Sequence, residues 1–159
     1  MRRAVRVKWP NDVLHSGRKV CGVLAESRVS GARLPLPPTV VIGAGVNVNQ
    51  SEADFPVELR DRATSLRIAG GGRSLSTDDV LAAILRRFER YLALASGGDA
   101  TDLWTAVTSR LPKPGTEVSL LSGGRRINGT VEGITESGAL RIRELGQAEV
   151  TVVSAGEMA

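Results

Sequence analysis

The segment from Thr39 to Asn49, which reads TVVIGAGVNVN, has the clearest chemical pattern in the chain. If it is an extended strand, its side chains alternate between two faces. One face then receives only apolar side chains, whereas the other receives Gly43, Gly45, Asn47 and Asn49. Glycines inside a strand often mark the close approach of a ligand or of another backbone. The pattern alone leaves two interpretations open: a groove ending in two amides, or space for a helix followed by a turn.

Charged residues precede this segment. Asn11 and Asp12 follow Lys8-Trp9-Pro10, and Lys19 begins the apolar run Val20–Ala25. A lysine keeps its positive charge at pH 7 unless it is strongly desolvated, so Lys19 could bind a carboxylate or a phosphate. A lysine at a strand end can also simply reach water, and Asn-Asp is common in turns. These residue types therefore indicate either an anion-binding site or residues with only a structural role.

The elements that would position these residues are strands. We expect extended segments at Arg3–Lys8, Val20–Ala25 and Thr39–Asn49, and a loop at Ser30–Pro38. The run Val20–Ala25 is apolar on both faces, which is typical of a strand buried in the middle of a sheet. Turns are expected at Trp9–Asp12, because proline restricts its neighbour and Asn and Asp favour turns.

Helices are expected to cover this sheet. Pro56–Leu66 could form a short helix, with the proline in its first turn. A longer helix is expected after Ser76, a hydroxyl cap followed by two acids, and it should end at Gly97-Gly98. A third is expected over Asp102–Leu111. Apolar residues recur at helical spacing along the longer helix: Leu81, Ile84, Leu85, Phe88 and Leu92.

A second region follows Leu111-Pro112-Lys113-Pro114-Gly115, a segment that ends any helix. From Gly115 to Ala159, short alternating runs separated by glycine turns are typical of a small antiparallel barrel. The sequence therefore predicts an α+β protein with domains at 1–111 and 112–159. A domain of about 45 residues is near the lower limit for independent stability, so we expect it to lean on the first.

Composition excludes several classes. The single cysteine cannot form an internal disulfide and fits a reducing, cytoplasmic location. No apolar run approaches the roughly 20 residues of a membrane-spanning helix, and no signal peptide is visible. The net charge of +4 and the sequence pI of about 10.0 permit nucleic-acid binding. However, the basic residues are dispersed along the chain and base-stacking aromatic residues are few. We therefore do not expect nucleic-acid binding to be the main role.

Three segments, in this order and at this spacing, resemble the biotin–protein ligases: Lys8–Asp12, Arg18–Glu26 and Val40–Asn49. Ala63–Leu66 and the C-terminal strands agree with the resemblance. Lipoate ligases, which share the catalytic fold, do not carry Lys-Trp-Pro-Asn-Asp in this form. The resemblance implies a partial biotin/lipoate ligase-like catalytic domain, with an incomplete mixed sheet and covering helices. A small Src-homology-3-like C-terminal barrel would follow it.

The resemblance also implies a two-step reaction. Biotin and ATP, with Mg²⁺, give biotinyl-adenylate and pyrophosphate, and a lysine of a biotin carboxyl carrier domain then takes the biotin and releases AMP. The carrier domain would belong to a biotin-dependent carboxylase, and the ligase could form a homodimer. A winged-helix domain that would bind DNA is absent from this sequence, so neither DNA nor a membrane is an expected partner.

The resemblance assigns roles to single residues of this chain through their positions in the matching motifs. Lys19 matches the lysine that contacts the biotin carboxylate and the adenylate phosphate, so it is the main catalytic candidate. Asp12 could orient the incoming amine or accept its proton, and Lys8 would support the turn. No residue is assigned as a direct metal ligand. Biotin-pocket residues would be Lys19, Gly22, Leu24, Gly43 and Ala44, and nucleotide-binding residues Asn11, Gly45 and Asn47.

The sequence departs from the family upstream of Lys8. The family's Gly/Arg-rich loop and its Ser/Thr-Asn biotin-contacting segment precede this motif, whereas here only seven residues do. We therefore expect a truncated form of doubtful activity on its own, with sheet edge and core exposed to water. The alternative hypothesis is a non-catalytic, basic module that binds nucleic acid or protein through the barrel.

Overall fold

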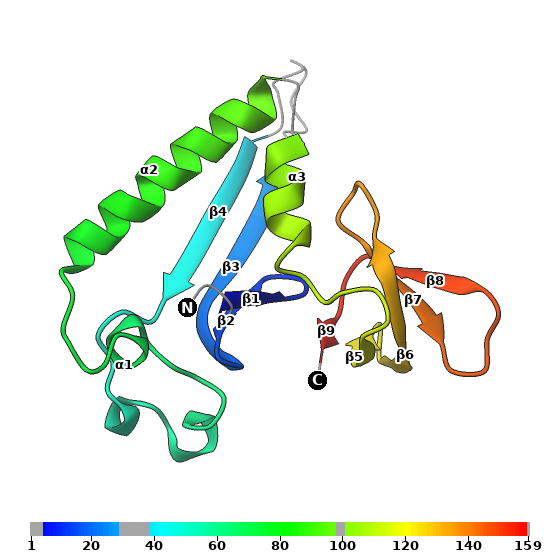
Figure 1. Ribbon diagram of the computed structural model, residues 1–159, viewed down its shortest axis with the longest axis horizontal. Coiled ribbons are helices and arrows are strands. Elements are labelled where there is room, and N and C mark those ends of the chain that lie inside the picture. The colour runs from blue at the N-terminus through cyan, green and yellow to red at the C-terminus, as the bar shows by residue number, and fades with distance from the viewer. Residues whose placement is uncertain (1–4, 29–38, 98–100, 159) are drawn as a thin grey trace.

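A computed structural model describes residues 5–28, 39–97 and 101–158. The chain forms two antiparallel sheets, with helices beside the first sheet (Figure 1). This agrees with the expected α+β class. The predicted loop at Ser30–Pro38, the start of the predicted strand at Arg3 and the second glycine of Gly97-Gly98 lie outside the described residues.

The first sheet has the strand order β1-β2-β3-β4. Two tight connections join its first three strands: Trp9–Asn11, with a cis Trp9–Pro10 bond, and the pair Ser16-Gly17. Ser16 and Gly17 take φ values of 50° and 84°, the positive φ that a two-residue hairpin turn of type I′ requires. The strands are β1 (Val5–Lys8), β2 (Asp12–His15), β3 (Arg18–Arg28) and β4 (Thr39–Val46).

All strand pairs in this sheet are antiparallel. The expected mixed sheet has, among the described residues, parallel pairing only at an isolated bridge between Lys19 and Ala63. The predicted helix at Pro56–Leu66 is wrong. In its place the chain forms a 3-10 turn at η2 (Val57–Leu59) and then extends, because residues beside Ala63 pair with the backbone of Lys19.

The helix predicted after Ser76 is confirmed as α2 (Thr77–Ser96). The Ser76 side chain accepts a hydrogen bond from the Asp79 amide, and Gly97 ends the helix. The third helix, α3, stops earlier than predicted, at Thr108. The other short elements are η1 (Glu52–Asp54), α1 (Leu66–Ala69) and α3 (Thr101–Thr108).

Apolar side chains of the first region remain open to solvent. On α2, Leu81 is 56% exposed and Phe88 43%, although their spacing makes one apolar stripe. The prediction that Val20–Ala25 is buried on both faces is wrong beyond its first residue, because Val20 is 6% exposed but Leu24 is 59%. The backbone of β3 is hydrogen-bonded on both sides, to β2 and to β4. Within the described residues, however, few side chains pack against the two faces of the strand.

The second sheet confirms the strands predicted after Gly115. Its strand order is β8-β7-β6-β5-β9, and its inner face is buried. No β8–β9 pairing closes it among residues 101–158, so the Src-homology-3-like barrel stays a prediction. The strands are β5 (Glu117–Ser122), β6 (Arg125–Ile134), β7 (Leu140–Glu144), β8 (Val150–Val153) and β9 (Glu157–Met158). We call these five strands the C-terminal sheet.

Trp9 joins the two regions. Its side chain is only 3% exposed, belongs to the core of the C-terminal sheet, and donates a hydrogen bond from Nε1 to the Gly138 carbonyl at 2.9 Å. Beside it, the Val7 amide donates to the Arg110 carbonyl at 2.9 Å. The C-terminal sheet therefore shares its core with the turn between β1 and β2. The division at residue 111 stays a prediction.

Candidate functional site

The register of the first sheet gathers several of the predicted site residues on one face. Asp12 lies opposite Gly22, Gly22 lies opposite Gly45, and Leu24 lies opposite Gly43. Directly opposed residues in antiparallel strands share a face, and so do residues two apart in one strand. Asp12, Gly22, Leu24, Gly43 and Gly45 therefore lie together on what we call the glycine face.

A β-bulge adds Lys19 to this face. Val13 lies opposite Cys21, but the next residue, Leu14, lies opposite Lys19, so Val20 is an extra residue in β3. Without it, strict alternation would put Lys19 on the same face as Cys21. The extra residue reverses the alternation and brings the lysine to the side of Asp12 and Gly22.

Lys19 and Asp12 form an ion pair across the strands. Lys19 Nζ lies 2.6 Å from Asp12 Oδ1, and the two side chains are 47% and 20% exposed. A Cβ atom at Gly22 would lie 3.2 Å from Lys19 Nζ and 3.4 Å from Asp12 Oδ1. A glycine at position 22 therefore leaves space for the lysine to cross toward Asp12, while its amine remains open to an anionic ligand.

The floor beside this ion pair is open. A Cβ atom at Gly43 would meet nothing within 4 Å, and one at Gly45 would meet only the Gly22 carbonyl oxygen, at 4.0 Å. Ala44 lies opposite Val23 on the other face, so only its backbone could take part in a site here. Two cavities of about 410 and 420 Å³ lie elsewhere, one between the two regions and one on the C-terminal sheet.

Asn47 and Asn11 lie at the ends of this floor. Asn47 follows β4, and its side-chain Nδ2 donates to the Thr64 carbonyl at 3.0 Å. Its Oδ1 has no hydrogen bond within the described ranges and stays available to a ligand. Asn11 is exposed beside Asp12, and its carbonyl accepts from the Val23 amide at 2.9 Å. Asn47 thus has a scaffold role in addition to any contact with a ligand.

The segment from Arg62 to Ser65 holds Lys19 in place. The Lys19 amide donates to the Arg62 carbonyl, and the Thr64 amide donates to the Lys19 carbonyl, both at 2.8 Å. Ser65 Oγ donates to the Gln50 carbonyl at 2.6 Å, and Thr64 and Ser65 are fully buried. Sequence reasoning placed this segment in a helix and in the family resemblance, but it did not predict its contact with Lys19. The sequence feature that could have pointed to this segment is Ser65, a serine directly before a short apolar helix, which is typical of an N-cap.

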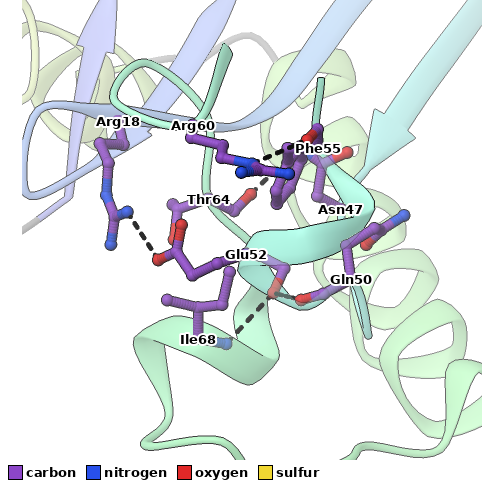
Figure 2. A network of polar contacts seen from close by, with 9 residues as sticks. Arg18, Asn47, Gln50, Glu52, Phe55, Arg60, Thr64 and Ile68 are labelled. Carbon is purple, nitrogen blue, oxygen red and sulfur yellow. Dashed lines mark hydrogen bonds and ion pairs between the residues drawn. The ribbon is translucent and has the colours of Figure 1, made fainter. Parts of the chain in front are cut away.

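Figure 2 shows the network of polar contacts around this segment, in which Asn47 donates to the Thr64 carbonyl. Arg18 Nη1 pairs with Glu52 Oε1 at 2.9 Å, and Arg60 Nε donates to the Phe55 carbonyl at 3.1 Å. The Arg18–Glu52 pair joins the start of β3 to the chain that follows β4, whereas the Arg60–Phe55 hydrogen bond lies within that chain. The backbone of Lys19 itself is held by its hydrogen bonds with Arg62 and Thr64.

Cys21 lies on the face opposite to the glycine face. Burial raises the pKa of its thiol; the positive charge of Lys19 opposes this rise and the negative charge of Asp12 adds to it. A raised thiol pKa disfavours the thiolate, the form in which a cysteine acts as a nucleophile. Among residues 5–28, 39–97 and 101–158, no three His, Cys, Asp or Glu side chains are grouped to hold a metal ion.

Comparisons with known proteins agree with this arrangement. Residues 1–47 match the model of the Biotin/lipoate A/B protein ligase family, and residues 115–159 match that of the Biotin protein ligase C terminal domain. The chain belongs to the biotin protein ligase family. The two matches include Lys19, the glycines of β4 and the whole C-terminal sheet.

Relatives match most of the chain. It is 32% identical over 157 residues to the biotin–acetyl-CoA-carboxylase ligase of Paracoccus denitrificans, covering 96% of this chain and 61% of that protein. It is 44% identical over 84 residues to the bifunctional ligase/repressor BirA of Bacillus spizizenii, covering 53% and 25%. The biotin protein ligase from Aquifex aeolicus in complex with biotin and ATP is 30% identical, with a TM-score of 0.75, covering 98% and 61%.

The chain therefore spans less than two thirds of the length of each of these relatives. None of the helices in the described part is both long and apolar enough to cross a membrane.

Proposed function

We propose that this chain carries the lysine-bearing part of a biotin protein ligase, which joins biotin to a lysine of a biotin carboxyl carrier domain in a cytoplasmic enzyme. The observation that carries this proposal is the Lys19 amine, half-exposed and 2.6 Å from Asp12, on the same face as an open floor of glycines. The complex of the Aquifex aeolicus relative with biotin and ATP supports the choice of substrates.

In the first step, a carboxylate oxygen of biotin attacks the α-phosphorus of ATP. The bond from this phosphorus to the oxygen that bridges to the β-phosphate breaks, and pyrophosphate leaves with the electron pair. The reactants repel each other because both are anionic, so a fixed positive charge between them lowers the barrier. Lys19 supplies this charge in our proposal. Gly22, Leu24, Gly43 and the Ala44 backbone would form the wall beside biotin.

Mg²⁺ would enter with ATP. Magnesium keeps several waters and is commonly held by substrate phosphates with one or two protein oxygens, so it needs no cluster of three acids. Asn47 Oδ1, which has no hydrogen bond with a described residue, is the oxygen that this chain would offer, and Asn11 and Gly45 would lie along the nucleotide. When bound, the ion neutralises phosphate charge.

In the second step, the carrier lysine attacks the carbonyl carbon of the mixed anhydride. A carbon–nitrogen bond forms, the carbon–oxygen bond to the phosphate breaks, and AMP leaves. The amine must lose a proton, and Asp12 is the acid beside Lys19 on this face. Once the adenylate phosphate engages Lys19, the Asp12 carboxylate is free to orient the amine and to accept its proton.

The alternative of a basic binding module is less well supported. Residues 115–159 contain four arginines and no lysine, but six glutamates, so this part of the chain is net acidic. Two of the arginines are already paired: Arg125 with Glu144 at 2.6 Å, and Arg143 with Glu132 at 2.8 Å. An acidic surface repels nucleic-acid phosphates, which speaks against this alternative.

The test is to incubate the chain with biotin, ATP, Mg²⁺ and a biotin carboxyl carrier domain, and to weigh the carrier by mass spectrometry. A form extended upstream in the same reading frame is assayed in parallel. We expect the extended form to add one biotinyl group to the carrier, and Lys19→Ala in that form to lower the rate about 100-fold or more, as loss of one transition-state charge contact does. Lys113→Ala, which removes an exposed lysine in the linker, is the matched control. A Lys19→Ala rate equal to that of the control would overturn the proposal.

A further inference from the structure

The glycine face carries more positive charge than the proposed chemistry uses. In β1, Lys8 lies opposite Asp12 and Arg6 lies opposite Leu14, which is itself opposite Lys19. Arg6, Lys8 and Lys19 therefore share this face. Lys8, Asp12, Gly22 and Gly45 form one row across the four strands, so the cations of β1 lead directly onto the glycine floor.

This charge is not neutralised within the described residues. Asp12 is already paired with Lys19, and the side chains of Arg6 and Lys8 have no hydrogen bond or ion pair with any described residue. The other acid that the register puts on this face, Glu26, lies four residues beyond Gly22, about 13 Å along β3. Three cations thus face one nearby carboxylate, and Arg6 is exposed to solvent.

The surroundings of the two cations favour a small anion over a macromolecule. Protein partners are bound mainly through buried aromatic anchors, and single-stranded nucleic acids through stacked aromatic rings. Strands β1 to β4 contain no Phe, Tyr or Trp in their described residues. The face offers adjacent cations beside a smooth glycine floor, which suits a compact ligand with several negative charges.

We propose that Arg6 and Lys8 form an anion subsite that binds the pyrophosphate portion of a nucleoside triphosphate, and inorganic pyrophosphate after it has left. This inference rests on the proposed function. Neighbouring strands are about 4.8 Å apart, so β1 lies roughly 10 Å from β3, where Lys19 binds the reacting phosphate. As the bond to the α-phosphorus breaks, negative charge grows on the departing pyrophosphate, and Arg6 and Lys8 stabilise it there.

The experiment measures binding of inorganic pyrophosphate to the 159-residue chain by isothermal titration calorimetry. The variants are Arg6→Gln, Lys8→Gln and the double variant, with Arg141→Gln as control. Arg141 is exposed on the C-terminal sheet and has no ion pair within the described ranges, so its loss changes the net charge equally. We expect each subsite variant to weaken binding about tenfold, the size of one charged hydrogen bond, and the control to match the unmodified chain. Added NaCl should weaken pyrophosphate binding to the unmodified chain.

Biotin binding by the same proteins separates this inference from the proposed function. If Lys8→Gln loses pyrophosphate but keeps biotin, the subsite is supported. If no protein binds biotin while pyrophosphate binding still depends on Arg6 and Lys8, the proposed function fails and the subsite stands. The subsite is overturned if the unmodified chain binds no pyrophosphate at millimolar concentration, or if all variants bind it equally. Binding of duplex DNA or heparin without pyrophosphate would overturn it too.

Discussion

The two sheets of this chain are built from similar alternating strands but use their faces differently. In the C-terminal sheet, Leu120 and Ile142 are completely buried. In the first sheet, Leu24 is 59% exposed, Val40 55% and Ile42 47%. Alternation therefore fixes which side chains share a face, whereas burial depends on what packs against that face. Leu24 lies on the glycine face with Lys19, whereas Val40 and Ile42 lie on the opposite face, so both faces of the first sheet are open within the described residues. The accessible chemistry therefore lies in the less covered region.

Replacement of Trp9, which joins the two regions, is the substitution that we expect to destabilise the chain most. We expect Trp9→Ala to lower the free energy of unfolding by about 3–5 kcal/mol, because a large buried ring and its hydrogen bond to Gly138 are lost. Urea unfolding followed by circular dichroism measures it. Trp104, which is 38% exposed on α3, is the matched control and should cost much less. Equal effects of the two substitutions would contradict the prediction that burial of Trp9 between the two regions stabilises the chain more than the packing of Trp104 does.

One isoleucine in each sheet tests whether burial differs between the two sheets. Ile142→Ala in β7 should cost about 2–5 kcal/mol, because it removes a fully buried side chain and leaves a cavity. Ile42→Ala in β4 should cost less than about 1 kcal/mol, because nearly half of that side chain is already in water. Thermal unfolding of the two variants under one condition measures the difference. A cost for Ile42→Ala as large as that for Ile142→Ala would show that another surface covers β4 in solution.

Local sequence signals predicted the elements better than the site. The helix capped by Ser76 and the strands other than β2 (Asp12–His15) follow from alternation, helical spacing and a capping residue. Sequence reasoning gave turns around Asp12–His15 and missed that strand. The helix predicted at Pro56–Leu66 failed because long-range pairing of Arg62 and Thr64 with Lys19 outweighed a favourable first turn. That pairing joins residues more than forty positions apart, and no local pattern reports it.

The face of Lys19 could not be derived from alternation. Counting along Val20–Ala25 by twos puts position 19 with Cys21, and only the extra residue in β3 moves it to the side of Gly22. The resemblance to the biotin–protein ligases pointed to Lys19 without explaining its orientation. By contrast, the grouping of Gly43 and Gly45 on one face followed from the sequence alone, because β4 has no bulge in its pairing with β3.

The smallest change in stability that we expect comes from two carboxylates, one in each region, as the pH falls. Hydrogen bonds from Thr151 and Arg125 lower the pKa of Glu144, and hydrogen bonds from the Ser51 amide and hydroxyl lower the pKa of Asp54. Each lowered pKa gives stability that is present above the carboxyl's ordinary pKa and is lost as the pH falls through the folded-state value.

Thr151→Val and Ser51→Ala each remove one of these hydrogen bonds. We expect each variant to unfold at a slightly lower temperature than the unmodified chain at pH 7, and the two proteins to converge near pH 2. Thermal scans between pH 7 and pH 2 measure the convergence. Each variant should keep part of its carboxyl's pKa shift, because Glu144 keeps Arg125 as a partner and Asp54 keeps the Ser51 amide and the nearby charge of Arg67. Differences that stay constant over the whole pH range would show that the hydroxyls act through packing and not through these carboxylates.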